Sequence, residues 1–172
     1  FVCNYVQWSE PHDVFCSLDG KNKSYCTPEA YRGSTCWLFR NRGNGKFEEV
    51  GFEENVALRE DGVYISGMGV DFRDLDNDGY PDIVIVALDG ETFPLYKNTG
   101  KGSFIEITRE SGMTKQSLPM SGYSPNIADF DNDGWKDVFV SRGHVQSLAS
   151  TNLVIDAGVH VTLDEFKGRR PI

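Results

Sequence analysis

The sequence predicts an all-β fold built from repeated units of four short strands. Three observations carry this prediction: two motifs recur at nearly equal spacings, β-prone runs alternate with turn residues, and helical patterns are weak. The chain has 172 residues, of which 18 are glycine. No stretch shows sustained apolar spacing of 3.6 residues bounded by helix caps, so helices are not expected to dominate the fold.

Two sequence elements recur and alternate along the chain. An Asp-rich segment that starts at Asp74 returns at Asp129, and a second element at residues 38–50 returns at residues 95–107. The repeat is about 55–57 residues long, which is close to the size of one propeller blade. Such a period is the signature of stacked, blade-like units.

Each unit is expected to hold four strands. In the first unit these lie at residues 37–41, 46–50, 64–72 and 82–88. The turn at residues 42–45, Arg-Gly-Asn-Gly, predicts a hairpin between the first two. The fourth strand is apolar at consecutive positions, which means that both of its faces are covered. Blades stacked in a β-propeller cover both faces of each sheet. A β-sandwich is the alternative, but it gives no reason for this period.

The chain is expected to begin in mid-pattern, because residues 1–6 look like the strand that follows an Asp-rich segment. About three units cannot close a ring, since propellers contain roughly 4–8 blades. We therefore interpret the chain as a partial propeller, whose remaining blades would be its neighbours. The predicted division is an orphan strand plus Cys-containing insert at 1–36, blade units at 37–92 and 93–147, and a partial or divergent blade at 148–172.

Charge and hydropathy exclude two classes of function. The net charge is −9 and the 17 Lys and Arg residues are scattered, which argues against a nucleic-acid partner. The longest apolar run, residues 83–88, is too short for a membrane span. An acidic surface favours metal cations as partners, or serves solubility alone.

All four cysteines lie within the first 36 residues. Cys16 and Cys26 bracket a polar, glycine-containing loop, which predicts a disulfide in an exported protein. Four reduced thiols in a cytosolic protein are the alternative. Cys3 and Cys36 are expected to pair only if their strands are neighbours, which the sequence leaves open.

Each Asp-rich segment has the spacing Asp-x-Asp-x-Asp-Gly-x-x-Asp, which suits a hard cation such as calcium. Alternate residues of a tight loop direct their oxygens inward, the glycine permits a sharp reversal, and position seven offers its backbone carbonyl. We expect about two calcium ions, one in each segment. The expected ligands are Asp74, Asp76, Asp78, Tyr80 and Asp82 in the first segment, and Asp129, Asp131, Asp133, Trp135 and Asp137 in the second.

Other interpretations of these segments fit less well. An EF-hand closes with an acid at position twelve and leads into a helix, but Ile85 and Val140 stand there and β-prone runs follow. A metal-free turn would leave four clustered aspartates without a counter-ion. Magnesium prefers to keep several waters, and soft metals prefer other ligands than oxygen. Asp71, which precedes the first segment, is either an acid that supports the metal ligands from behind or an ordinary strand-end residue, and we favour the ordinary interpretation.

The Asp-rich segments and their flanking strands resemble FG-GAP repeats, also called VCBS repeats, as in integrin α-subunit propellers. The element at residues 38–47 and the stretch around Cys16 and Cys26 are similar to the cartilage acidic protein family and its bacterial relatives with an ASPIC/UnbV domain. This resemblance implies a calcium-stabilised, seven-bladed propeller in an exported protein, either extracellular or periplasmic. The chain departs from the family in lacking an ASPIC/UnbV domain and in having Cys3 and Cys36.

The sequence contains no catalytic constellation, because it has neither a G-x-S-x-G nor an H-E-x-x-H motif and its three histidines are scattered. The predicted function is a non-enzymatic, calcium-stabilised extracellular module that binds a protein or a glycan. The alternative is a piece of a secreted propeller enzyme, such as a polysaccharide lyase, whose catalytic residues lie elsewhere.

Overall fold

The computed structural model describes residues 1–26, 30–119, 121–143 and 159–161, and these residues form an all-β fold, as predicted. One 3₁₀ turn, η1 (Glu10–His12), and one short helix, α1 (Met113–Ser117), are the helical segments of this described part. The strands are β1 (Phe39–Gly43), β2 (Lys46–Glu49), β3 (Gly69–Arg73), β4 (Asp82–Val86), β5 (Leu95–Asn98), β6 (Phe104–Glu106), β7 (Ser121–Ala128), β8 (Asp137–Gly143) and β9 (Val159–Val161). Apart from β9, the predicted tail at 148–172 lies outside the described residues.

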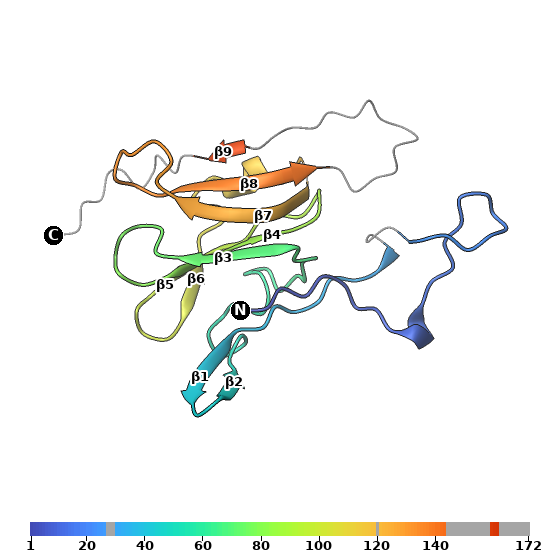
Figure 1. The fold of residues 1–172 in the computed structure, drawn as a ribbon, viewed down its shortest axis with the longest axis horizontal. Coiled ribbons are helices and arrows are strands. Elements are labelled where there is room, and N and C mark those ends of the chain that lie inside the picture. Colours follow the sequence, from blue (N-terminus) through green and yellow to red (C-terminus); the bar gives the residue numbers. More distant parts are fainter. Residues whose placement is uncertain (27–29, 120, 144–158, 162–172) are drawn as a thin grey trace.

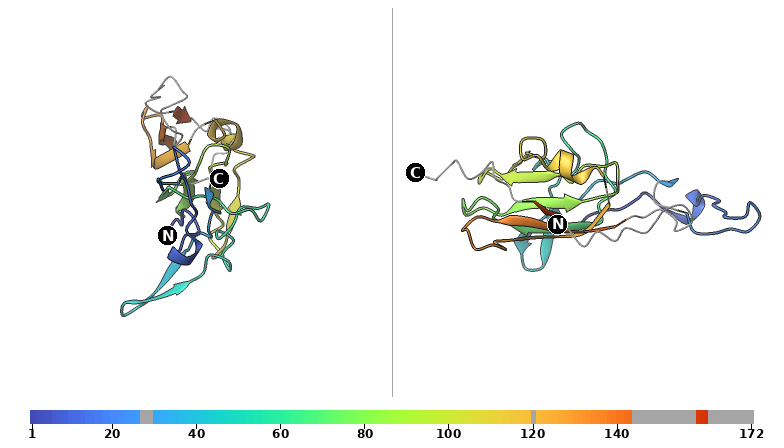
Figure 2. Two further views of the ribbon diagram at one scale, coloured as in Figure 1. Left: turned by 90° about the vertical axis from the view of Figure 1, so that its right-hand side faces the viewer. Right: turned by 90° about the horizontal axis from the view of Figure 1, so that it is seen from above.

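The strands form three antiparallel sheets that follow one another along the chain (Figure 1). Their strand orders are β1-β2, β3-β4-β5-β6 and β7-β8-β9, so every neighbour in a sheet is also a neighbour in sequence. Seen from above in Figure 2, the Cys-containing insert projects away from the sheets. The Asp-rich segments connect β3 to β4 and β7 to β8, and both lie at the opposite end of the molecule (Figure 1).

The four-stranded sheet is out of phase with the sequence repeat. In the sequence repeat, the strands at 37–50 and those at 64–88 belong to one unit. In the structure, β3 and β4 form a sheet with β5 and β6, which belong to the next unit. Short connections join β3, β4, β5 and β6, so antiparallel pairing of consecutive strands is favoured, whereas a longer segment separates β2 from β3. The predicted third strand is also shorter than expected, because β3 begins at Gly69 and Ile65 makes only an isolated bridge to Ser34.

The N-terminal segment pairs with the start of the first blade unit. Val2 and Trp37 form an isolated antiparallel bridge, with N–H to carbonyl distances of 2.7 and 2.9 Å in the two directions. On its other side, Asn4 accepts a backbone hydrogen bond of 3.2 Å from Gly67. The segment therefore lies between the first unit and the four-stranded sheet, although the described structure forms no continuous strand there.

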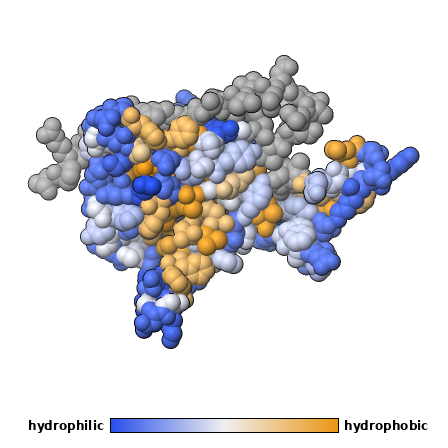
Figure 3. Space-filling view, in the orientation of Figure 1, coloured by the Kyte–Doolittle hydropathy of each residue, from blue (hydrophilic) through white to orange (hydrophobic). Residues whose placement is uncertain are grey.

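One apolar core runs through the second and third sheets and the residues that flank the first sheet, and β4 is at its centre. All five β4 residues are buried, including Asp82, and its four apolar side chains are 0% exposed. The prediction that both faces of this strand are covered is confirmed. Figure 3 shows a hydrophilic end where the Asp-rich loops lie, and an apolar area over the middle of the same face. The core also includes Leu38 and Val50 from the first unit, Leu95 and Tyr96 from the second, and Ile127, Val138 and Val140 from the third sheet.

Strands β3 and β7 approach closely at the seam between the second and third sheets. A Cβ atom at Gly69 would lie 2.4 Å from the carbonyl oxygen of Tyr123, so this position has no room for a side chain. The Asp71 carboxylate accepts a hydrogen bond of 2.7 Å from the backbone N–H of Ile127. The interpretation of Asp71 as an ordinary strand-end residue is wrong, because its side chain joins two sheets.

We expect Gly69→Ala to lower the free energy of unfolding by about 2 kcal/mol, because the new Cβ forces the β3 and β7 backbones apart. Chemical denaturation of the full chain measures this change. Ile105→Val is the control, since Ile105 is an exposed strand residue and its shortening should cost little. A Gly69→Ala variant as stable as this control would show that the seam adapts to a methyl group.

Candidate metal centre

The two Asp-rich loops share one backbone conformation. Asn77 and Gly79 in the first loop have φ values of 62° and 89°, and Asn132 and Gly134 in the second have 59° and 90°. These left-handed positions suit Asn and Gly, and they fold each loop back on itself within a few residues. The loops are also neighbours in space, because the Asn77 side-chain amide donates a hydrogen bond of 3.0 Å to the Gly134 carbonyl.

The first loop gathers three of its predicted ligands. One carboxylate oxygen from each of Asp74, Asp76 and Asp78 lies within 4.8 Å of the others. Asp74 also accepts backbone hydrogen bonds of 3.1 and 2.8 Å from Asp78 and Gly79, which fixes the loop around it. The Oδ1 atom of Asp76 is buried and accepts no hydrogen bond in the described part of the chain. Such an oxygen is costly to bury without a partner.

Lys97, from β5, brings a positive charge to the first loop. Its ammonium group donates to Asp76 Oδ2 and, at 2.9 Å, to Asp78 Oδ2. Partial burial lowers the pKa of Lys97, while the charge of Asp74 acts in the opposite direction. The ammonium thus neutralises part of the charge of the three carboxylates. The sequence analysis missed this residue, because only the pairing of β4 with β5 brings it to the loop.

Asp82, the fourth predicted carboxylate of this loop, faces inward. Its Oδ2 accepts a 2.9 Å hydrogen bond from the Leu75 N–H and its Oδ1 a 2.8 Å bond from the Asn98 N–H. Burial raises the pKa of Asp82 to about 6, although these two N–H groups oppose the rise. Asp82 is not grouped with the other three carboxylates, and it anchors the loop to β5 instead. Tyr80 closes the turn by donating its N–H to Asp78 Oδ1 at 2.9 Å.

The second loop gathers a different set of carboxylates. Oxygens of Asp129, Asp131 and Asp137 lie within 4.8 Å of one another, whereas Asp133 is outside this group. Asp133 Oδ1 accepts the Trp135 N–H at 2.9 Å, which repeats the turn contact of the first loop. Asp137 Oδ2 accepts the Phe130 N–H at 3.0 Å, as Asp82 does with Leu75. Each loop therefore clusters three of the four carboxylates that its spacing predicts.

The residues present fit a hard divalent cation. Every clustered donor is a carboxylate oxygen, which calcium prefers and soft metals do not. Three such groups within 4.8 Å repel one another unless a positive charge is near. The buried oxygen of Asp76 supplies an additional unfilled acceptor at the centre of the first loop.

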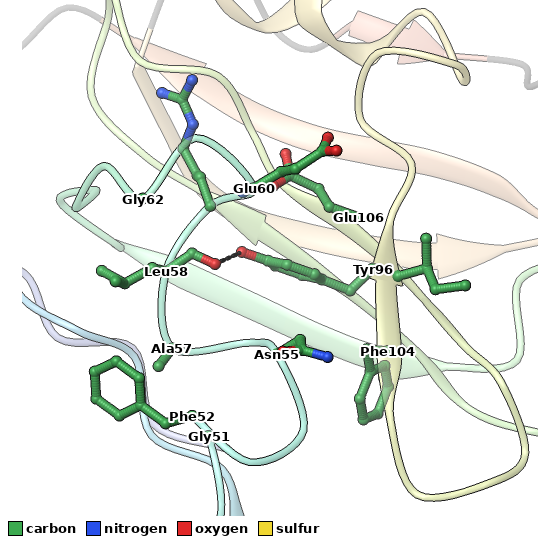
Figure 4. Close-up of a pocket in the computed structure, with 12 residues that line it drawn as sticks. Gly51, Phe52, Asn55, Ala57, Leu58, Glu60, Gly62, Tyr96, Phe104 and Glu106 are labelled. Atoms are coloured by element: carbon green, nitrogen blue, oxygen red, sulfur yellow. Dashed lines mark hydrogen bonds between the residues drawn. The ribbon is translucent and has the colours of Figure 1, made fainter.

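A separate cavity of about 430 Å³ lies between the segment after β2 and the β5-β6 hairpin (Figure 4). Tyr96 crosses it, with its hydroxyl donating to the Leu58 carbonyl at 3.0 Å. Burial raises the pKa of Tyr96 far above its usual value. The lining includes the charged residues Arg59, Glu60 and Glu106.

The cysteine-containing insert carries the predicted disulfide. Cys16 and Cys26 are bonded, with a Cα–Cα distance of 5.2 Å, and this bond is typical of an oxidising compartment. Cys3 and Cys36 are free thiols. In the part of the chain that the structure describes, no helix has the length and apolar character needed to cross a bilayer.

Comparison with known proteins gives consistent matches. The FG-GAP-like repeat family matches residues 13–85 and, in an overlapping second match, residues 74–140. Cartilage acidic protein 1 of Xenopus tropicalis is 34% identical over 108 residues, which cover 62% of this chain and 16% of that protein. Integrin alpha-4 of Xenopus laevis is 29% identical over 136 residues, which cover 70% of this chain and 13% of that protein.

The chain thus spans less than a fifth of the length of these two curated relatives. The family match covers both Asp-rich loops and the strands around them. Together with the three consecutive antiparallel sheets, it is consistent with the repeated all-β units that the sequence predicts. The chain belongs to the FG-GAP-like repeat family.

Proposed function

We propose that this chain is part of a non-enzymatic, calcium-stabilised extracellular β-propeller that binds a protein or a glycan. The observation that carries the proposal is the carboxylate cluster of the first loop, with its buried, unpartnered Asp76 oxygen. In the absence of a cation, mutual repulsion of the carboxylates and the buried Asp76 oxygen both cost stability.

Calcium would add positive charge to the carboxylate clusters, beyond what Lys97 brings to the first loop. In the first loop Asp74, Asp76 and Asp78 would hold the ion, and in the second Asp129, Asp131 and Asp137. From the residue spacing, we also propose the Tyr80 carbonyl and Asp82 as oxygen ligands in the first loop, and the Trp135 carbonyl and Asp133 in the second. Because the loops join strands of two adjacent sheets and contact each other, ions bound there would fix the relative position of these sheets.

The extracellular location is supported by the Cys16–Cys26 disulfide and by similarity to an integrin α-subunit and a cartilage acidic protein. We propose an extracellular protein or glycan as partner, in addition to the remaining blades of the propeller. The net charge of −9 argues against nucleic acid. The enzyme alternative gains no support from the lining of the Tyr96 cavity.

Calcium should raise the melting temperature of the full chain, because it binds the folded loops and not the unfolded chain. At a concentration of about 100 times Kd, each site is expected to add about 2.7 kcal/mol to the free energy of unfolding. Scanning calorimetry with calcium, with magnesium and with a chelator measures this. An identical melting curve in calcium and in chelator would contradict the proposal.

Asp76→Asn and Asp131→Asn should each remove one of two calcium sites, because each variant loses a central charged ligand while keeping the side-chain shape. Isothermal titration calorimetry counts the remaining sites. Glu53→Gln is the matched control, since it removes one negative charge from an exposed residue outside both loops. Two undiminished sites in both loop variants would place calcium elsewhere.

Lys97→Met should tighten calcium binding at the first loop by about tenfold, because the ion no longer displaces an ammonium from Asp76 and Asp78. The second loop, probed in the same titration, should not change. Lys97→Arg keeps the charge and Lys101→Met removes an exposed charge outside the cluster, so both serve as controls. Unchanged or weaker binding in Lys97→Met would show that the lysine does not compete with the ion.

A further inference from the structure

The two free cysteines lie opposite each other on neighbouring segments. Val2 and Trp37 exchange both backbone hydrogen bonds, at 2.7 and 2.9 Å. In an antiparallel pair, the next position along is therefore a non-hydrogen-bonded pair, and here it consists of Cys3 and Cys36. The Cα atoms of such pairs are about 4.5 Å apart, which is within the range of about 4.4–6.8 Å that disulfides require.

The two side chains meet in a closed space. Cys36 is only 1% exposed, and Cys3 is half-buried. A Cβ atom at Gly67 would lie 3.2 Å from the Cys3 Cβ, so the glycine leaves the space that Cys3 fills. The Cys3 sulfur also lies 3.6 Å from the Gly69 carbonyl oxygen. Cys3 is thus held between the first unit and the four-stranded sheet, with its sulfur facing Cys36.

The two thiols differ in acidity. The hydrogen bond from Cys3 lowers the pKa of Cys36, and the Asn4 N–H contributes in the same direction against the effect of burial. The same contact, followed by burial, raises the pKa of Cys3. Thiolates are the nucleophiles of disulfide exchange.

We propose that Cys3 and Cys36 form a second, cross-strand disulfide that closes the base of the Cys-containing insert. The oxidant is a small disulfide such as oxidised glutathione. During folding, while both thiols are accessible, the thiolate of one cysteine attacks one of its sulfurs, which forms a mixed disulfide and releases one glutathione thiolate. The thiolate of the other cysteine then attacks the protein sulfur of this mixed disulfide and releases the second glutathione. The protein is oxidised by two electrons, and its two thiol protons end on the two glutathione molecules.

This bond would nest the Cys16–Cys26 loop inside a larger one. The N-terminal segment is held beside residues 32–37 by one isolated bridge and by single hydrogen bonds from Asn4 and Gln7, not by a strand ladder, so a covalent link adds to these contacts. The insert between the two cysteines exposes the large apolar side chains of Trp8, Phe15 and Tyr25. Fixing its base would limit how far this apolar arm moves relative to the sheets.

The test uses the full chain, refolded in a glutathione redox buffer, alkylated in denaturant and mapped as peptides without reduction. The expected result is a Cys3–Cys36 linked peptide beside the Cys16–Cys26 peptide, and no alkylated cysteine. Alkylation of Cys3 and Cys36 while Cys16 and Cys26 stay protected would overturn the proposal, as would crossed pairing between the two sets. The result does not depend on calcium binding, so it stands apart from the proposed function.

A second measurement isolates the new bond in a Cys16→Ser, Cys26→Ser variant, where it is the only possible intramolecular disulfide. Dithiothreitol should lower the melting temperature of this variant by about 5–10 °C. The matched control adds Cys36→Ser, and reductant should not shift its melting temperature. An equal response to dithiothreitol in both variants would also overturn the proposal. If the double variant does not fold, the peptide map of the unmodified chain still decides.

Discussion

Burial of β4 on both faces is the constraint on which the rest of the structure depends. A strand whose apolar residues are all unexposed needs partners above and below its sheet as well as beside it. The neighbouring sheets supply them, so a single core passes from Leu38 through Ile85 to Val140. The second and third sheets cannot be treated as separate domains, because both contribute side chains to this one core.

Close stacking places strict demands on the seams between sheets. At the seam of β3 and β7 the backbones approach so closely that Gly69 has no room for a Cβ atom. Asp71 satisfies the Ile127 N–H there, a backbone donor on a neighbouring sheet. At the other seam, Gly67 makes room for Cys3. Glycine and short polar side chains thus permit the contact that the apolar residues drive.

The same stacking concentrates negative charge at one end of the molecule. Each Asp-rich loop connects the first two strands of its sheet, so successive loops emerge side by side, and Asn77 joins them directly. Asp82 and Asp137 start the following strands and accept hydrogen bonds from backbone N–H groups within their loops, so each ties its loop to the strand that follows. Lys97 compensates part of the negative charge in the first loop.

The sequence by itself determined the all-β class, the repeat, the two acidic loops and the Cys16–Cys26 pair, because each of these features depends on the spacing of nearby residues and on turn-forming residues. Only the tertiary structure decided how the strands group into sheets, since the repeat shows a period but not where a sheet begins within it. It also decided which carboxylates cluster, because Asp82 turns toward the Leu75 and Asn98 N–H groups of the folded chain. Pairing of β4 with β5 brings Lys97 to its loop, and the bridge between Val2 and Trp37 places Cys3 opposite Cys36. Both contacts join segments that are distant in sequence, so the residue spacing within one segment cannot predict them.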